Sequence, residues 1–152
     1  MPLHQYAYFA LFSQHISADD MASRLGITPD EVTVRGSRCT EPAVLPTDHS
    51  WMVVCREPGL RVDEQITRIL DRLQPHTDRI CDLTRRLAGT GGGAVLQAVR
   101  YFNDVDRPQA DTTGAPNLFG WHLDREVLDF LNATGAELDV DEYDMTGDKN
   151  AD

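Results

Sequence analysis

Two carboxylates near the end of the chain have a spacing that could bind a cation. Asp139 and Asp141 alternate along a strand that we predict at 136–143, so both side chains should lie on one face of it, about 7 Å apart. Carboxylate oxygens are the ligands that Mg²⁺ and Ca²⁺ prefer, although this segment lacks the glycine and the bidentate glutamate of an EF-hand loop. Solvated or salt-bridged acids would show the same spacing, and both interpretations are open.

Strand alternation adds an arginine and a histidine to the face that carries these carboxylates. Trp51 and Trp121 are expected to mark the side of their strands that helices cover, so residues one position out of phase should point to the opposite side. The candidate ligand-binding residues are therefore Arg56, His122, Asp139 and Asp141. The same face should also carry Met52, Val54, Val95, Gln97, Val99, Tyr101, Tyr143 and either Tyr6, Tyr8 and Phe12 or Ala7, Phe9 and Leu11.

No segment has the signature of a cofactor site. The glycine-rich run 89–93 follows a predicted helix and opens a strand. Phosphate-binding loops follow a strand and open a helix, so we interpret this run as a linker. The five histidines form no HxH or HExxH pair, and the three cysteines form no CxxC pair. We therefore expect no metal centre and no cofactor, and we expect the cysteines to be reduced structural thiols.

Hydrophobic periodicity predicts the elements that must position these side chains. Strands are expected at 5–13, 32–35, 50–57, 94–102, 118–123 and 136–143, with loops at 36–49 and 103–117. Apolar residues at helical spacing run over 62–87 and are interrupted at Pro75. Helix caps are expected at Ser17, Gly26, Asp124 and Gly135. The predicted fold is α+β, with ferredoxin-like βαβ units forming a mixed, largely antiparallel sheet and about three helices packed mainly on one face.

The chain is acidic, and its charge is unevenly placed. Its 152 residues carry a net charge of −11, and residues 124–152 contain ten acids and only two bases. A field of that sign disfavours nucleic acid and anionic membrane as partners, and it favours a basic protein partner or simply solubility. The lack of a signal peptide and of a long apolar span predicts a cytoplasmic protein. We expect a single domain over residues 1–145 and a flexible acidic tail at 146–152.

Several segments resemble a known protein family. They are YFAL at 8–11, LGITP at 25–29, the tryptophan at 51 and, above all, GWHLD at 120–124 and TGAELDVDEY at 134–143. Together they are similar to the bacterial domain-of-unknown-function family 4279, over roughly residues 5–145. The resemblance implies a small α+β fold, and it implies no particular activity, cofactor or site residue.

Two classes of function are consistent with these observations. The first is a non-catalytic protein-interaction module, immunity-like or regulatory, that binds a basic protein through the open sheet face or the acidic C-terminal region. An inhibitor of a basic toxin would be one example. A homodimer through the sheet face, or a face covered by the long loops, would explain the same apolar pattern. The second class is a small-ligand-binding or metal-dependent enzyme that uses Arg56, His122, Asp139 and Asp141.

Overall fold

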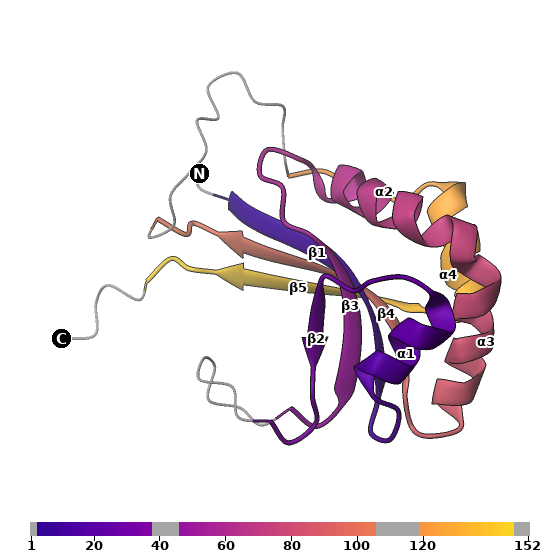
Figure 1. Ribbon diagram of the computed structural model, residues 1–152. Helices are drawn as coiled ribbons and strands as arrows, with labels where there is room; N and C mark the ends of the chain where they lie inside the picture. Colours follow the sequence, from indigo (N-terminus) through magenta and orange to yellow (C-terminus); the bar gives the residue numbers. More distant parts are fainter. Residues whose placement is uncertain (1–2, 38–45, 106–118, 148–152) are drawn as a thin grey trace.

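A five-stranded sheet with helices on one side forms the framework of the protein (Figure 1). The computed structural model describes residues 3–37, 46–105 and 119–147. The strands are β1 (Leu3–Ser13), β2 (Glu31–Thr33), β3 (His49–Cys55), β4 (Gly93–Phe102) and β5 (Glu137–Asp144). The helices are α1 (Ala18–Leu25), α2 (Val62–Leu73), the short 3-10 helix η1 (Gln74–His76), α3 (Thr77–Ala88) and α4 (Arg125–Thr134).

The sheet is mixed and largely antiparallel, in the order β2-β3-β1-β4-β5. The central strand β1 is antiparallel to both β3 and β4, and β2 is antiparallel to β3. Among the described strands, β4 and β5 are the one parallel pair, and α4 makes the crossover connection that a parallel pair requires. The α+β class and the mixed sheet that the sequence predicts are therefore confirmed.

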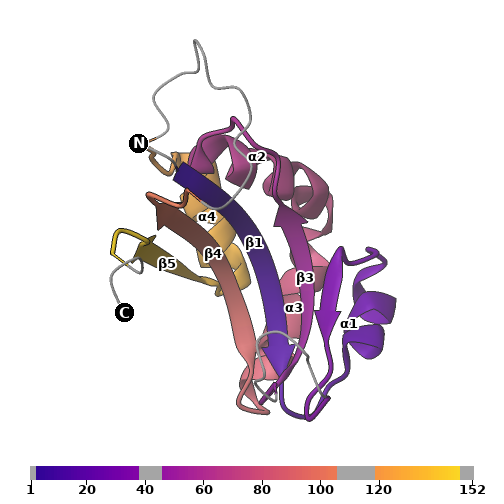
Figure 2. The same cartoon turned by 90° about the vertical axis from the view of Figure 1, so that its left-hand side faces the viewer.

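The helices form a layer on one side of the sheet. Figure 1 shows this layer edge-on, and Figure 2 shows the opposite sheet face toward the viewer with the helices behind it. Because α2, η1 and α3 follow one another directly, the layer consists of three parts: α1, the α2–η1–α3 arm and α4. Pro75 lies in η1, so the predicted interruption of the long helical segment is confirmed.

The core lies between the sheet and the helices, and strand alternation builds it. Ala7, Phe9 and Leu11 of β1 are fully buried, as are Trp51 and Leu96 on the neighbouring strands. The helices contribute an apolar stripe that consists of Met21, Leu25, Ile66, Ile69, Leu73, Ile80, Leu83 and Leu87. Of the two choices for β1, the set that points to the open face is therefore Tyr6, Tyr8 and Phe12.

The predicted helix caps form as expected. They are Ser17 and Asp124 at the N-termini of α1 and α4, and Gly26 and Gly135 in the left-handed conformation at their C-termini. At the start of α1, for example, the backbone N–H of Asp20 donates to Ser17 Oγ over 3.2 Å. Such caps satisfy N–H groups that the first helical turn leaves unpaired, which is why short polar residues there locate helix ends in a sequence.

The strand predicted at 118–123 is wrong for the residues that the structure describes. Residues 119–123 pair with no strand, and β5 occupies the edge of β4. Trp121 and Leu123 nevertheless pack against the core while His122 is exposed, so the segment alternates as a strand does. Alternation reports which side chains are buried and does not report whether the backbone pairs, which is why the sequence suggested a strand here.

Some of the predictions concern residues 38–45, 106–118 and 148–152, which lie outside the described part of the chain. They include most of the two predicted loops, Cys39 and most of the acidic tail. Of the other cysteines, Cys55 and Cys81 are free thiols. Among the helices of the described ranges, none has the length and the apolar character that crossing a membrane requires.

Candidate functional site

All four tyrosines of the chain lie on the sheet face that the helices leave open, which Figure 2 shows toward the viewer. β1 carries Tyr6 and Tyr8, and the strand register pairs Tyr101 of β4 with Tyr143 of β5. We call this surface the tyrosine face and define it by its aromatic and polar side chains: His4, Tyr6, Tyr8, Arg56, Gln97, Tyr101, Asp139, Asp141 and Tyr143.

The rings of the tyrosine face form a strip across β1, β4 and β5. Tyr101 and Tyr143 stack with their ring centroids 5.1 Å apart, and Tyr6 and Tyr8 stack at 6.3 Å. His4 lies between the two pairs, 6.2 Å from Tyr6 and 5.9 Å from Tyr101. Tyr143 is 46% exposed, and the other three tyrosines are half-buried. The strip therefore presents aromatic surface that a partner could contact.

A chain of two hydrogen bonds orders the polar centre of the tyrosine face. The hydroxyl of Tyr8 donates to Gln97 Oε1 over 2.5 Å, and Gln97 Nε2 donates to Oδ2 of Asp141. Because the amide of Gln97 accepts at one atom and donates at the other, its orientation is fixed and Asp141 is the final acceptor. Asp139 precedes Asp141 on the same face of β5, and its carboxylate makes no hydrogen bond or ion pair with the residues that the structure describes.

The environment of Tyr8 makes the stability of the protein depend on pH above neutrality. Partial burial, together with Tyr6 and the carboxylates of Asp141 and Asp139, raises the pKa of Tyr8 to about 12 from its ordinary 10.0. The folded state therefore retains the phenolic proton where the unfolded chain has lost it. The stabilisation that this gives is complete below pH 10 and is lost as the pH rises from 10 toward 12.

The variant Tyr8→Phe has no phenolic proton and tests this dependence. We expect the difference in unfolding free energy between the unchanged protein and Tyr8→Phe to decrease as the pH is raised past 10. Denaturant unfolding at a series of pH values measures that difference. A difference that stays constant across the series would contradict the environment described for Tyr8.

An arginine of the chain itself occupies the β1–β3 side of the tyrosine face. Arg56, directly after β3, donates through Nε and Nη2 to Glu31 Oε1, at 3.3 and 3.0 Å. Its guanidinium carbon lies 4.2 Å from the centroid of the Tyr6 ring. Arg56 is therefore held by a cation–π contact and by charge-assisted hydrogen bonds at the same time.

Strand β5 gives the other side of the tyrosine face an acidic character. Five of its eight residues are acids and none is basic. Three of these acids, Glu137, Asp139 and Asp141, belong to the open face, whereas Glu142 lies on the helix side, 4.0 Å from Arg100. β5 is an edge strand, and charges on an edge strand oppose its pairing with the same strand of another molecule.

A hollow of about 280 Å³ continues the open face beyond Tyr8. Its floor is largely apolar, and its lining consists of Tyr8, Ala10, Phe12, Thr33, Pro46, Thr47, Asp48, Ser50, Met52 and Val95. A concave apolar surface beside oriented polar groups is typical of binding sites. The open face therefore combines an apolar end, an aromatic centre and an acidic edge.

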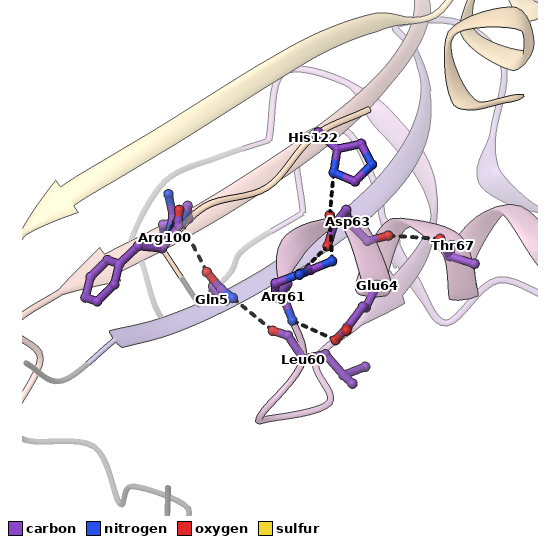
Figure 3. Close-up of polar contacts among 9 residues, drawn as sticks. Gln5, Leu60, Arg61, Asp63, Glu64, Thr67, Arg100 and His122 are labelled. Carbon is purple, nitrogen blue, oxygen red and sulfur yellow. Dashed lines mark hydrogen bonds and ion pairs between the residues drawn. The ribbon is translucent and has the colours of Figure 1, made fainter. Parts of the chain in front are cut away.

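His122 does not lie on the tyrosine face. Its Nδ1 is 3.2 Å from Oδ2 of Asp63, which lies in the first turn of α2 on the helix-covered side (Figure 3). Arg61 donates to both oxygens of Asp63, at 3.0 and 3.2 Å, and the three side chains line a pocket of about 180 Å³. The expected grouping of His122 with the other candidates is wrong, because it depended on a strand at 118–123.

A second polar network lies on the helix-covered side of the sheet, beside the pair of Arg61 and Asp63 (Figure 3). Arg100 is only 4% exposed, and it donates to Gln5 Oε1 over 3.1 Å and to the carbonyl of Phe119 over 3.0 Å. Gln5 in turn donates to the carbonyl of Leu60 over 2.9 Å. These bonds connect the segments around Leu60 and Phe119 to the centre of the sheet, and they give Arg100 and Gln5 a structural role.

The structure brings together only part of the candidate set. Arg56, Asp139 and Asp141 share the open face, Arg56 with Glu31 and the two aspartates beside Gln97, so the proposed enzyme site loses its histidine. Within the described ranges, no group of three or more His, Cys, Asp or Glu side chains could hold a metal ion. The role of Glu31 was missed, although extending the strand predicted at 32–35 by one residue would have placed it opposite Met52.

Comparison with known proteins identifies the family of the chain. A protein-family model described as "Domain of unknown function (DUF4279)" matches residues 3–145. Because the match covers nearly the whole chain, the protein belongs to this family, and the resemblance seen in its sequence is confirmed. No curated protein and no solved structure matches the chain.

Proposed function

We propose that this member of the DUF4279 family is a non-catalytic interaction module that binds a basic protein through the tyrosine face. The observation that carries the proposal is the placement of all four tyrosines on the helix-free face, next to the acids of β5. Tyrosine is enriched in protein interfaces because its ring supplies contact area while its hydroxyl finds a hydrogen-bond partner. The rings that stabilise the fold are different ones, Phe9 and Trp51, and both are fully buried.

The charge of β5 favours a basic partner over a second copy of the chain. A second copy on the same face would add its own β5 acids to those of the first, and each chain already carries a net charge of −11. A basic partner would neutralise the same carboxylates and would be steered toward them from a distance. A homodimer through this face is an outcome that the crosslinking experiment below detects.

We place the protein in the bacterial cytoplasm, and the free thiols of Cys55 and Cys81 are compatible with a reducing compartment. An immunity-like inhibitor of a basic toxin, or a regulatory subunit, would fit this setting.

The order β2-β3-β1-β4, with helices between β1 and β2 and between β3 and β4, supports a ferredoxin-like core that α4 and β5 extend.

Site-specific photocrosslinking in cells tests which surface meets the partner. A benzophenone amino acid replaces Tyr143 on the tyrosine face, and in the matched control it replaces Leu128, whose side chain is exposed on α4. We expect the variant at position 143 to capture one basic protein and the variant at position 128 to capture none. Capture of a second copy of the chain would replace the basic partner by a homodimer, and capture from position 128 alone would overturn the proposal.

Binding of the purified partner should depend on the carboxylates of the face. The double variant Asp139→Asn/Asp141→Asn removes two charges at nearly constant side-chain size, and it should raise the Kd about tenfold and make association less sensitive to salt. The control Asp71→Asn/Asp129→Asn removes the same charge from exposed positions on α2 and α4. If both double variants weaken binding equally, the attraction is a matter of net charge and the tyrosine face is not the site.

A further inference from the structure

We infer that the β4–β5 half of the tyrosine face binds an arginine side chain of the basic partner. This half consists of Gln97, Tyr101, Asp139, Asp141 and Tyr143. The inference rests on the proposed function and names the chemical group that the partner presents. The carboxylates of Asp139 and Asp141 accept the N–H groups of the guanidinium, and the paired rings of Tyr101 and Tyr143 contact its flat surface.

The other half of the face shows this mode of binding within the chain itself. Arg56 is held by the Tyr6 ring, 4.2 Å away, and by Glu31, whose Oε1 accepts from two of its nitrogens. A tyrosine of β1 and a carboxylate of β2, the strands on either side of β3, therefore orient a guanidinium on this sheet. Because Arg56 already covers Tyr6, we expect the arginine of a partner to use the carboxylates and rings of the β4–β5 half.

The β4–β5 half contains the same two kinds of group, a pair of tyrosine rings and two carboxylates. Among the described residues, no arginine is paired with Asp139 or Asp141. Asp139, Asp141 and Tyr143 occupy consecutive same-face positions on β5, about 7 Å apart. Their cross-strand partners on β4 are Gln97, Val99 and Tyr101. An extended arginine side chain that lies along β5 therefore reaches a carboxylate and the tyrosine pair at once.

The hydrogen-bond chain from Tyr8 prepares Asp141 for this ligand. Gln97 donates to Oδ2 of Asp141, and this bond restricts the rotation of the carboxylate before a ligand arrives. A preorganised acceptor loses less side-chain entropy when a ligand binds. A planar guanidinium donates in two directions within one plane and also stacks on rings, so it suits this arrangement better than the compact ammonium of lysine.

Fluorine NMR of protein labelled with 3-fluorotyrosine tests the inference. The label gives four resonances, one for each tyrosine of the chain, and Tyr→Phe variants assign them. The probe is N-acetyl-arginine methylamide, and its uncharged isostere N-acetyl-citrulline methylamide is the control. We expect the arginine probe to shift the Tyr101 and Tyr143 signals saturably and to leave Tyr6 unchanged. The citrulline probe should bind at least about fivefold more weakly, because it lacks the charge.

Two variants connect the NMR shifts to the carboxylates. Asp139→Asn/Asp141→Asn should abolish the saturable shifts, and Asp139→Asn alone should weaken the binding. The single variant removes no hydrogen bond between described residues, so the fold should be unaffected and the result can be interpreted even if the double variant is unstable. Equal binding of the citrulline probe, or shifts that neither variant changes, would overturn the arginine inference.

The fluorine NMR titration and the crosslinking experiment together show whether the arginine inference fails alone or fails with the proposed function. If a basic protein is captured at position 143 but the arginine probe produces no saturable shift, the arginine inference is wrong and the proposed function stands. If the partner is captured only from position 128, the proposed function is wrong, and the arginine inference, which rests on it, fails as well.

Discussion

Replacing Gly92 by alanine should lower the unfolding free energy by about 3 kcal/mol or more. The new Cβ would lie 2.1 Å from the backbone oxygen of Phe12 and 3.1 Å from its carbonyl carbon. Both atoms belong to β1, which is paired on both sides and cannot move away without breaking the centre of the sheet. Denaturant unfolding followed by circular dichroism measures the loss.

Alanine variants at two nearby glycines are controls that separate the steric overlap at Gly92 from the other effects of adding a methyl group. At Gly91 φ is +75° and a Cβ would meet nothing within 4 Å, so Gly91→Ala should cost only the roughly 1–2 kcal/mol of a left-handed backbone. At Gly89 the nearest atom is 3.5 Å away, an ordinary contact, and alanine should be neutral or slightly stabilising. If Gly92→Ala is as stable as Gly91→Ala, the glycine-rich run 89–93 does not pass as close to β1 as the structure shows.

Replacing Trp51 by alanine should lower the unfolding free energy by about 3–5 kcal/mol. The side chain is fully buried between the sheet and the helices, and its Nε1 donates to the carbonyl of Ile27 over 3.4 Å. The variant therefore leaves a large cavity and removes the indole donor from that carbonyl. The same denaturant unfolding measures the effect.

The next residue of β3 is the matched control for Trp51. Met52 is half-buried, points to the open face and lines the hollow beside Ala10. Met52→Ala should cost clearly less, about 1 kcal/mol, because its side chain is only partly removed from water. A loss at Met52 as large as that at Trp51 would mean that the open face is covered, and it would remove the tyrosine face as an accessible surface.

Local signals in the sequence were sufficient to predict most of the fold. Capping depends on a few consecutive residues, so Ser17, Gly26, Asp124 and Gly135 located the ends of α1 and α4 without any knowledge of the sheet. Alternation placed Asp139 and Asp141 on one face of β5, because successive side chains of a strand point to opposite sides. These features do not depend on which strands pair with which.

The parts of the site that depend on distant pairing could not be predicted in this way. Whether β1 turns its tyrosines or its phenylalanine at position 9 toward the helices depends on the packing of the whole layer, and the sequence left both choices open. His122 was misplaced because a loop segment that packs against a core can alternate as a strand does. Its partner Asp63 is far away in the sequence, and no local pattern connects the two.

The most direct test of the tyrosine face uses the basic partner captured by crosslinking and protein labelled with both 3-fluorotyrosine and 5-fluorotryptophan. The four tyrosines report on the open face, Trp121 reports on the helix side and buried Trp51 is an internal reference. We predict that saturating partner shifts or broadens the tyrosine signals, Tyr143 most of all, and leaves the Trp51 signal in place. If all four tyrosine signals stay unchanged while the Trp121 signal moves, the partner binds on the helix side and the tyrosine face is not the functional surface.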